Sequence, residues 1–376
     1  MTKKISIWDI PRSVAPWRIK LFKTFDHLVG GLITFLLPSL PKKAFPQGIN
    51  SILIIRPGGI GDAVFLLPIL RALKKQGCVI DILCEKRNTE VFNSQEHLVN
   101  LVYLYDEDHI AIFRNKYDLV VDTEQWHYLS ALTTYFIRSR YKIGFTSRPR
   151  RSKLFHKVVE YDHEAYELDN FTKLFKDILI DGDVKGLEGS FEIPKNSQTW
   201  ARDQIKAEFV TLFLGASIVL RRLNEKQLTT IIQHYLGKGF SVVLIGGNDV
   251  EDLALQIFTQ IKSSQIYNFV GKISLLQSSA LIHRSSLFIG PDSGFMHLAC
   301  AINVPVVGIF GPGRKSKWGP KGIQHKIISE NLPCSPCTTF GYTLPTCKGS
   351  YPCMKHESSF KGFNQNEILE LSEDPT

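Results

Sequence analysis

One stretch, between residues 51 and 68, constrains the fold more than any other. An apolar run from Ser51 to Arg56 is followed by three glycines within four residues and then by Asp62. The run predicts a buried strand, and the residues after Asp62 have the composition of a helix. Glycines suit a tight turn where a ligand comes close to the backbone, because they carry no Cβ atom. We therefore expect a strand, a turn and a helix.

Asp62 stands at the start of this helix, where two roles are open. A carboxylate there can cap the helix. A turn that held only phosphate would gain nothing from a negative charge at its rim, so the same carboxylate is also a candidate for chemistry. The local sequence leaves both roles open.

Further strand-like runs alternate with helical stretches, in two sets. The first set comprises residues 51–56, 78–84, 101–104, 117–122 and 141–144, and the second comprises residues 209–214, 241–245, 286–290 and 304–310. A long helix over residues 166–180 and a polar stretch separate the sets. Such alternation predicts parallel sheets covered on both faces. We expect an α/β protein of two doubly wound, Rossmann-like domains that face each other across a cleft, because ligands of such sheets bind beyond the carboxyl ends of the strands.

The length of 376 residues fits two domains, each with a core of its own. We expect an N-terminal arm over residues 1–48 and a first Rossmann-like domain over residues 49–200. A second Rossmann-like domain should cover residues 201–330, and a cysteine-rich segment with a C-terminal helix should cover residues 331–376.

The formal net charge of +9 is unevenly distributed. The first fifty residues carry eight Lys or Arg against two Asp, and residues 138–157 carry eight Lys or Arg and no acidic residue. Such stretches favour an anionic partner, with a merely solvated basic surface as the alternative. No nucleic-acid-binding motif accompanies them, so we do not expect a nucleic acid as partner.

The arm contains an apolar run from Leu28 to Leu37, about half the length that a bilayer-spanning helix requires. Upstream of it, aromatic residues alternate with basic ones, the composition of a helix that lies in the headgroup plane. The alternative is that the arm packs its apolar residues on the protein's own surface. Seven cysteines and the lack of a cleavable signal pattern argue against a secreted disulfide framework. We expect a cytoplasmic protein, peripheral on the inner-membrane surface.

Polar motifs follow the expected strands of both sets. After the strand 117–122 come Asp122, Glu124, Gln125 and His127. A capped helix start explains Asp122 but not the clustering of the other three.

In the second set, Leu214-Gly-Ala-Ser217 is followed by Arg221 and Arg222. Guanidinium groups offer paired hydrogen bonds to phosphate oxygens, so this pair suits a diphosphate, and solvated arginines at a helix start are the alternative. The strand-end turn at Gly246 and Gly247 is a weaker signal.

The stretch from Gly290 to Ala301 is the most informative. It places Asp292, Ser293 and Gly294 at a strand's carboxyl end, and a helix of small residues follows. The first N–H groups of such a helix point at an anion, and the Ser293 hydroxyl would reinforce them. Another glycine turn, at residues 308–312, should reach the same edge. We favour an anion site over ordinary turn chemistry.

Taken together, the motifs resemble glycosyltransferase family 9, the ADP-heptose:lipopolysaccharide heptosyltransferases, which have the GT-B fold. The matching pieces occur in the family's order at residues 54–62, 117–122, 214–217, 271–276, 290–297 and 318–320. The resemblance implies an inverting transferase that needs no cofactor for catalysis. It would move heptose from ADP-heptose to a hydroxyl of an anionic cell-envelope glycolipid, the lipopolysaccharide core or a related acceptor, or else to a protein.

The resemblance also implies roles for individual residues. Asp62 matches the family's proposed general base, and residues 292–294 match its donor-phosphate turn. We accordingly expect the ADP-sugar on the C-terminal domain, at Ser217, Arg221, Gly246, Gly247, Asp292, Ser293, Gly294 and His297. We expect the acceptor on the N-terminal domain, at Gly59, Gly61, Asp122, Glu124, Gln125 and His127.

Two features depart from the family pattern. Where the family commonly has Lys-x-Trp-Pro, this chain has Arg221-Arg-Leu-Asn224, which keeps a positive charge and loses the aromatic residue and the proline. The arm before Ile52 lies outside the common family core.

Four cysteines near the C-terminus have a spacing that suits a structural metal: Cys334, Cys337, Cys347 and Cys353. The second pair is spaced more widely than in a typical zinc ribbon. Similar cysteine-rich tails occur in the family, including protein heptosyltransferases in which they hold iron. We expect a structural zinc or iron, with four reduced cysteines in a packed lobe as the alternative.

Two other functions compete. A NAD-dependent oxidoreductase would use Gly59 and Gly61 with Glu85, but Val64 occupies the third small position of that fingerprint. A non-catalytic membrane scaffold would explain the arm but would leave the strand-end polar residues without a role.

Overall fold

The computed structural model describes residues 24–105, 107, 109–146, 148–180, 182–330, 332–338 and 352–354. The aromatic and basic residues before Thr24, together with Cys347 and the expected C-terminal helix, lie outside these residues. The chain divides into two compact units, an N-terminal unit, Pro11–Ser190, and a C-terminal unit that begins at Phe191. The finer domain boundaries expected from the sequence stay a prediction.

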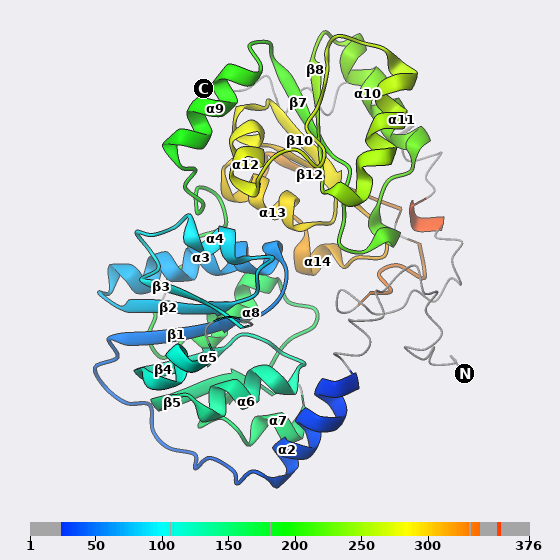
Figure 1. Ribbon diagram of the computed structural model, residues 1–376. Coiled ribbons are helices and arrows are strands. Elements are labelled where there is room, and N and C mark those ends of the chain that lie inside the picture. Colours follow the sequence, from blue (N-terminus) through cyan, green and yellow to red (C-terminus); the bar gives the residue numbers. More distant parts are fainter. Residues whose placement is uncertain are drawn as a thin grey trace. The chain divides into compact units, whose positions relative to one another are not determined.

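The N-terminal unit is built on a parallel sheet of six strands in the order β3-β2-β1-β4-β5-β6 (Figure 1). The strands are β1 (Ser51–Arg56), β2 (Val79–Cys84), β3 (Leu101–Leu104), β4 (Lys116–Asp122), β5 (Arg138–Phe145) and β6 (Lys157–Val159). The helices are η2 (Asp26–Gly30), α2 (Gly31–Leu36), α3 (Ile60–Lys75), α4 (Thr89–Asn93), α5 (His109–Arg114), α6 (Tyr128–Phe136), α7 (Pro149–Ser152) and α8 (Glu167–Leu174). Residues 52–55 of β1 are fully buried, as the central strand of a parallel sheet requires.

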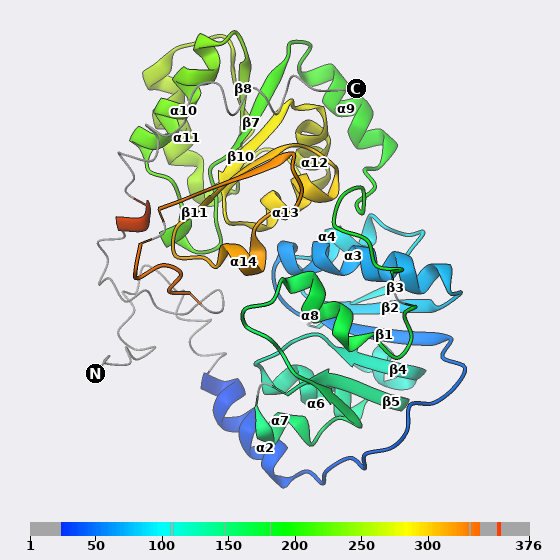
Figure 2. The same ribbon diagram turned by 180° about the vertical axis from the view of Figure 1, so that it is seen from behind.

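The C-terminal unit repeats the plan, with strand order β12-β11-β10-β7-β8-β9 (Figure 2). The strands are β7 (Phe209–Phe213), β8 (Ser241–Ile245), β9 (Ile266–Asn268), β10 (Leu287–Pro291), β11 (Val306–Phe310) and β12 (His325–Ser329). The helices are α9 (Lys195–Gln204), η3 (Val219–Arg221), α10 (Glu225–Gly237), η4 (Asn248–Val250), α11 (Glu251–Ile261), α12 (Leu275–Arg284), α13 (Gly294–Ala301), α14 (Lys315–Trp318) and η5 (Pro352–Met354).

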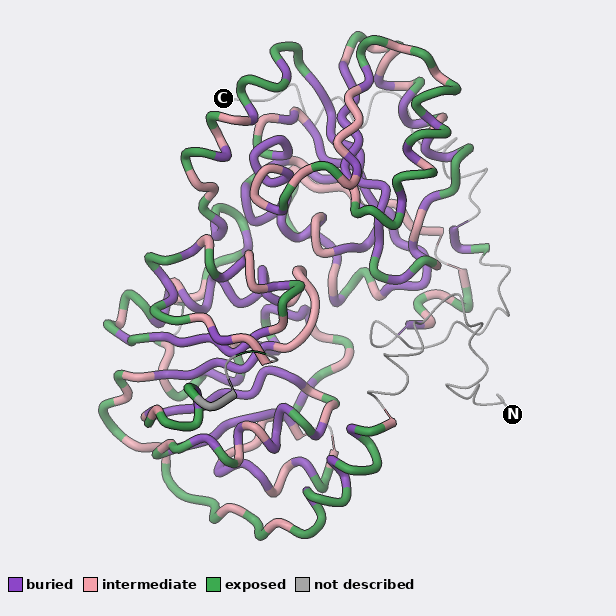
Figure 3. Tube along the Cα trace, viewed as in Figure 1, coloured by how far each residue is buried: buried purple, intermediate pink, exposed green. Residues whose placement is uncertain are grey.

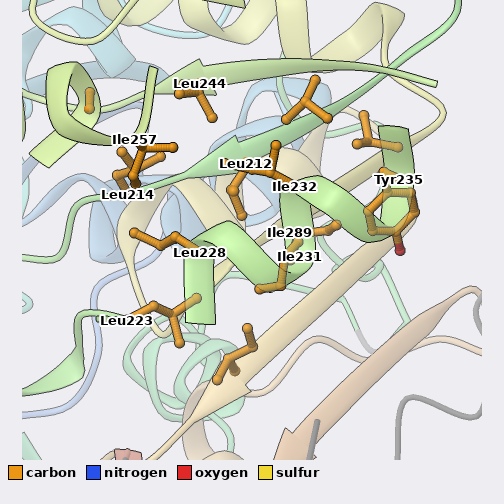
Figure 4. Close-up of a cluster of buried hydrophobic side chains, with 14 of the residues drawn as sticks. Leu212, Leu214, Leu223, Leu228, Ile231, Ile232, Tyr235, Leu244, Ile257 and Ile289 are labelled. Carbon is orange, nitrogen blue, oxygen red and sulfur yellow. The ribbon is translucent and has the colours of Figure 1, made fainter. Parts of the chain in front are cut away.

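Each unit has its own core. In the C-terminal unit, apolar side chains of α10, such as Leu228 and Ile232, pack with Leu212 of β7 and Leu244 of β8 (Figure 4). Figure 3 shows the strands of both sheets as largely buried. Both sheets are therefore doubly wound, and the α/β class and the two-sheet organisation expected from the sequence are confirmed.

The elements differ from expectation in several places, and β5, expected over residues 141–144, spans Arg138–Phe145. The long helix expected over residues 166–180 ends at Leu174, and turns follow. Helix α3 begins at Ile60, two residues before Asp62. Strands β6, β9 and β12 were not expected, because β6 and β9 are only three residues long and all three lie at sheet edges, where the apolar signal is weak.

None of the described helices combines the length and the apolar character that a bilayer-spanning helix needs.

Candidate active site

The chain order reverses at one place in each sheet, between β1 and β4 and between β7 and β10. At such a switch point the loops from neighbouring strands run in opposite directions and leave a crevice beyond the carboxyl ends, where doubly wound sheets bind their ligands. Residues 57–62 and 122–127 follow β1 and β4, and residues 214–222 and 292–294 follow β7 and β10. The topology therefore brings most of the predicted polar motifs to the two switch points.

In the N-terminal unit, Arg56 at the end of β1 connects the predicted motifs. Its Nη2 lies 3.2 Å from Oδ2 of Asp62 and 3.8 Å from Oε2 of Glu124. Its Nη1 donates a 2.9 Å hydrogen bond to the carbonyl oxygen of Thr123. Burial disfavours the charge of Arg56, but the two carboxylates outweigh it and raise the pKa of this guanidinium. One buried cation thus joins β1, the start of α3 and the loop after β4.

The glycine turn is shaped around this ion pair. Gly58 has φ +127°, and a Cβ atom there would lie 2.8 Å from Nη2 of Arg56 and 3.4 Å from Oδ2 of Asp62. A side chain at Gly58 would therefore strain the backbone and displace the guanidinium. At Gly59 a Cβ would meet nothing within 4 Å, so that side of the turn is open. The strict requirement for glycine thus falls on Gly58.

Asp62 is not the helix cap. The N-cap position is Gly59, no side chain caps the helix, and Asp62 is the third residue of α3. The side chain of Asp62 is 31% exposed, against 10% for Glu124 and 0% for Asp122. Of these three carboxylates at the switch point, Asp62 is therefore the one that a substrate reaches most easily.

Asp122 faces the interior. It forms a buried ion pair with Arg151 of α7, and burial raises its pKa to about 6 although Arg151 opposes the shift. Arg151 also donates hydrogen bonds to the carbonyl oxygens of His127, at 3.0 Å, and Phe145, at 3.1 Å. An acceptor contact through Asp122, as expected from the sequence, is therefore not supported, because the carboxylate is inaccessible and helps to fix the loop.

The remaining polar side chains of this loop point in different directions. Oε1 of Glu124 accepts a 2.8 Å hydrogen bond from the amide of Trp126. Burial raises the pKa of Glu124, but the charges of His127 and Arg56 reverse the effect and lower it. Gln125 contacts the Tyr161 hydroxyl at 3.4 Å. His127 lies 3.4 Å from Asp26. Glu124 thus belongs with Asp62, whereas His127 is turned towards the arm.

In the C-terminal unit, the start of α13 has the features of an anion site. Ser293 is the N-cap of this helix, but its side chain caps no backbone group. Its Oγ is buried and has no hydrogen-bond partner in the described part of the protein. A buried hydroxyl beside the first N–H groups of a helix is suited to bind an anion.

Arg221 lies at the same switch point. Its Nη1 is 2.9 Å from Oδ2 of Asp292, and its guanidinium carbon is 5.7 Å from the ring centroid of Trp318. His297, one turn into α13, is buried, and burial together with Arg221 lowers its pKa to about 3. His297 is therefore neutral near pH 7. Arg221 thus pairs with Asp292, which directly precedes Ser293 in the sequence.

The other predicted donor-side residues lie further along the sheet. Arg222 is paired with Asp249 and donates a 3.0 Å hydrogen bond to the carbonyl oxygen of Ala216. Ser217, four residues after β7 ends, is exposed, and the turn at Gly246 and Gly247 follows β8, one strand beyond the switch point. The structure thus separates the two arginines, with Arg221 alone reaching Asp292.

Sequence reasoning missed three residues that organise the N-terminal site: Arg56, Arg151 and Asp26. Only Arg56 had a local signal, a charged residue that ends an otherwise apolar strand immediately before a glycine turn. Arg151 and Asp26 act on a loop that lies more than twenty residues away along the chain.

The described cysteines of the C-terminal segment dock on the turn after β11. The Ser335 hydroxyl donates a 2.5 Å hydrogen bond to the Gly311 carbonyl oxygen, and the amide of Cys337 donates one of 3.2 Å to Pro312. A Cβ at Gly311 would lie 3.2 Å from the carbonyl oxygen of Cys353. Within the described residues no three metal-ligating side chains are grouped around one point. Because Cys347 lies outside those residues, the metal site expected from the sequence stays a prediction.

Comparison with known proteins identifies the class. The family model of glycosyltransferase family 9 (heptosyltransferase) matches residues 110–346, more than half of the chain. Lipopolysaccharide heptosyltransferase 3 of Escherichia coli is 24% identical over 291 residues, which cover 69% of this chain and 83% of the relative.

Solved structures of low sequence identity share the fold. The E. coli ADP-heptose lps heptosyltransferase II superposes with a TM-score of 0.70 at 18% identity, covering 86% of this chain and 98% of the other. The bacterial iron-containing dodecameric glycosyltransferase TibC from enterotoxigenic E. coli superposes with a TM-score of 0.50 at 15% identity, covering 88% and 75%.

Two doubly wound parallel sheets, matched by a solved heptosyltransferase structure, define a protein of the GT-B fold. The chain belongs to glycosyltransferase family 9, the heptosyltransferase family. The resemblance and the enzyme class expected from the sequence are thereby confirmed, and the oxidoreductase and scaffold alternatives are set aside.

Proposed function

We propose that this enzyme is an inverting heptosyltransferase that moves heptose from ADP-heptose to a hydroxyl of an anionic cell-envelope glycolipid, the lipopolysaccharide core or a related acceptor. Family membership supports the sugar transfer, and the names of two similar proteins contain lipopolysaccharide or ADP-heptose. The observation that carries the donor assignment is the unpartnered, buried hydroxyl of Ser293 at the start of α13.

The diphosphate of the donor would bind at the start of α13. The first amides of the helix and the Ser293 hydroxyl are donors, and an anion is stabilised there by the helix dipole. Arg221 would contribute the charge, through the Nε that has no partner in the described part of the protein. Its ion pair with Asp292 keeps the guanidinium in place before the donor arrives. Ser217, Gly246 and Gly247 would contact the nucleoside.

The acceptor would bind at the open side of the glycine turn, beside Gly59 and Gly61. An inverting transfer requires a base that takes the proton of the acceptor hydroxyl as it attacks the anomeric carbon opposite the leaving ADP. Asp62 is suited to this role, because it is the most exposed of the three carboxylates at the switch point. Arg56 would hold Asp62 in position, and Glu124, Gln125 and His127 would form the rest of the acceptor surface.

The enzyme would work at the cytoplasmic side of the inner membrane, as a peripheral protein, because its acceptor is anchored there. The chemistry needs no cofactor, since each step is a proton transfer or a displacement of ADP.

We also propose that Cys334, Cys337, Cys347 and Cys353 hold a structural zinc or iron. The residues around Cys334 and Cys337 and the backbone of Cys353 both lie beside the turn at residues 311–312, so the metal proposal rests mainly on the spacing of the four cysteines. Four thiolates suit either metal, and the ion would tie the segment to the turn after β11.

Product analysis tests the proposed function. The purified enzyme is incubated with a deacylated, water-soluble core oligosaccharide and either ADP-heptose, ADP-glucose or UDP-glucose. We expect heptose transfer from ADP-heptose, with an anomeric configuration by NMR opposite to that of the donor. Preferred transfer from another donor, or retained configuration, would contradict the proposal. Transfer to protein but not to the oligosaccharide would move the acceptor class to proteins.

A further inference from the structure

The arm helix, defined here as η2 and α2, buries its small and polar residues and exposes its large apolar ones. The side chains that it buries are small or polar, namely Asp26, Gly30, Gly31 and Thr34. Large apolar side chains face outward, and Leu28, Leu32 and Leu36 are 64%, 59% and 71% exposed. These leucines are four residues apart and therefore lie on one face of the helix. Figure 3 shows the same alternation of buried and exposed segments along this helix. The alternative that the arm packs these residues on the protein's own surface is therefore not supported.

The inner face makes close contacts that explain this arrangement. A Cβ at Gly30 would lie 3.0 Å from the Tyr128 side chain, so only a residue without a side chain allows the helix to approach α6. Asp26 accepts hydrogen bonds from the amides of Tyr128, at 3.1 Å, and Leu129, at 2.7 Å. It thus caps α6, which has no cap from its own loop.

Helix α7 lies beside α2 of the arm helix (Figures 1 and 2), and basic residues of α7 and its flanks contact the arm. Nη1 of Arg148 is 3.3 Å from the His27 ring, and Arg150 stacks over the Phe35 ring at 5.6 Å. Lys153 donates a 2.9 Å hydrogen bond to the Phe35 carbonyl oxygen. Between residues 24 and 48 the single acidic residue is Asp26, and it is buried. The outer face therefore combines apolar and cationic groups without an accessible carboxylate of its own helix.

These features select one partner. Within the described residues, helical backbone runs from Thr24 through the arm helix to Leu36, about 20 Å, and an amphipathic helix of this kind is suited to lie in a bilayer surface. A second copy of the chain paired symmetrically through this face would bring the same arginines close to each other, which is unfavourable. A lipid surface offers acyl chains to the leucines and phosphates to the arginines.

We propose that the outer face of the arm helix docks on an anionic lipid surface, with the leucines in the acyl boundary and Arg148 and Arg150 at the headgroup phosphates. The inference deepens the proposed function, on which it rests for a membrane-bound acceptor. Because Asp26 of the same helix caps α6 and lies 3.4 Å from His127, the docked helix would be connected directly to the loop that carries Glu124 and His127.

Vesicle flotation tests the docking face. The triple variant Leu28→Ser, Leu32→Ser, Leu36→Ser changes only exposed side chains, so its fold should be unaffected. A matched control, Ile180→Ser, Leu255→Ser, Ile323→Ser, removes apolar side chains that are 68%, 58% and 97% exposed elsewhere. With vesicles of phosphatidylcholine and phosphatidylglycerol we expect the first variant to lose at least tenfold in partition coefficient and the control to bind as the wild type does.

A second variant tests how much the arginine charges contribute to vesicle binding. Arg148→Gln with Arg150→Gln should weaken binding to the anionic vesicles about tenfold or more and leave the weak binding to pure phosphatidylcholine unchanged. High salt should reduce the wild-type binding in the same way.

Two outcomes would overturn the inference. One is equal vesicle binding by the wild type and the leucine variant. The other is a wild-type dimer in sedimentation that becomes monomeric in the leucine variant while neither binds vesicles, which would make the face an interface between copies. Transfer to the deacylated oligosaccharide separates this test from the proposed function, because the leucine variant should retain it. Wild-type protein that binds vesicles but transfers no heptose would contradict the proposed function alone.

Discussion

Replacing Asp62 by Asn separates a catalytic carboxylate from a structural one. Asn keeps the size of the side chain and an oxygen that still accepts a hydrogen bond from Arg56, but it takes no proton from an acceptor. In the structure Asp62 caps no backbone group, so the variant loses no cap. What it loses is the charge of one ion pair, at 3.2 Å, in which the carboxylate is 31% exposed.

The expected cost in stability is small. A partly exposed pair that keeps its hydrogen bond should lose about 1 kcal/mol. For a unit of this size, Pro11–Ser190, that corresponds to a decrease in melting temperature of about 2–4 °C. The expected cost in turnover is much larger, because removal of a general base typically lowers the rate by about 10²- to 10⁴-fold, or roughly 3–5 kcal/mol in activation free energy.

The chain offers a matched control in Asp118. Its carboxylate is 3.0 Å from Arg140 and 21% exposed, and it lies in the same unit at the start of β4. The amides of Asn50 and Ser51 donate to it, which helps to lower its pKa to about 2 although burial opposes the shift. Asp118→Asn should therefore cost at least as much stability as Asp62→Asn and leave turnover unchanged.

The assay measures ADP release and product formation under saturating donor, with melting temperature and ADP affinity for each variant. We expect Asp62→Asn to bind ADP normally and to turn over at least a hundredfold more slowly. A fully active Asp62→Asn enzyme would refute the reasoning and direct the search for the base to Glu124 or His127. Equal loss of activity in Asp118→Asn would show that the assay reports stability.

Three further predictions follow from the contacts. Arg221→Ala should weaken ADP binding about 10- to 150-fold by calorimetry, because one charge-assisted phosphate contact is lost. Arg222→Ala should leave ADP affinity unchanged. If Arg222→Ala weakens binding and Arg221→Ala does not, the phosphate contact belongs to Arg222. Asp26→Ala should destabilise the N-terminal unit by about 1 kcal/mol near pH 7 through loss of the α6 cap. Burial raises the pKa of Asp26, but hydrogen bonds to His127 and Leu129 outweigh it and lower the pKa, so this stability is present above the unfolded value of 3.8 and is lost as pH falls through the folded value. Wild type and variant should therefore converge in denaturant titrations at strongly acidic pH, and a constant difference would contradict the cap. Purified protein should contain near-stoichiometric zinc or iron, and chelation should lower its melting temperature; elemental analysis that finds no metal would favour a packed lobe of reduced cysteines.

The sequence by itself determined those elements whose conformation depends on residues adjacent in the chain. The β-branched run at residues 51–56 is central and buried, so its hydrophobicity alone predicted β1 with correct ends. The glycine turn after it was equally readable, because Gly58 needs a positive φ that other residues rarely adopt. Two sets of alternating strands and helices predicted two doubly wound sheets, since that alternation leaves few other topologies.

Tertiary structure decided which polar residues meet. The local sequence predicts the same acceptor-side role for Asp122, Glu124 and His127, which are close along the chain. In the structure each has a different partner: Asp122 pairs with Arg151, Glu124 lies near Arg56, and His127 contacts Asp26. Those partners lie far along the chain, and a strand end can point its side chains to either side without changing its local pattern. The arm helix shows the same limit most clearly. The sequence left two roles open for its apolar run, in the headgroup plane or packed on the protein's own surface. Only the fit of Gly30 against Tyr128 and the cap that Asp26 provides to α6 show which face of the helix packs inward and that the leucines are exposed.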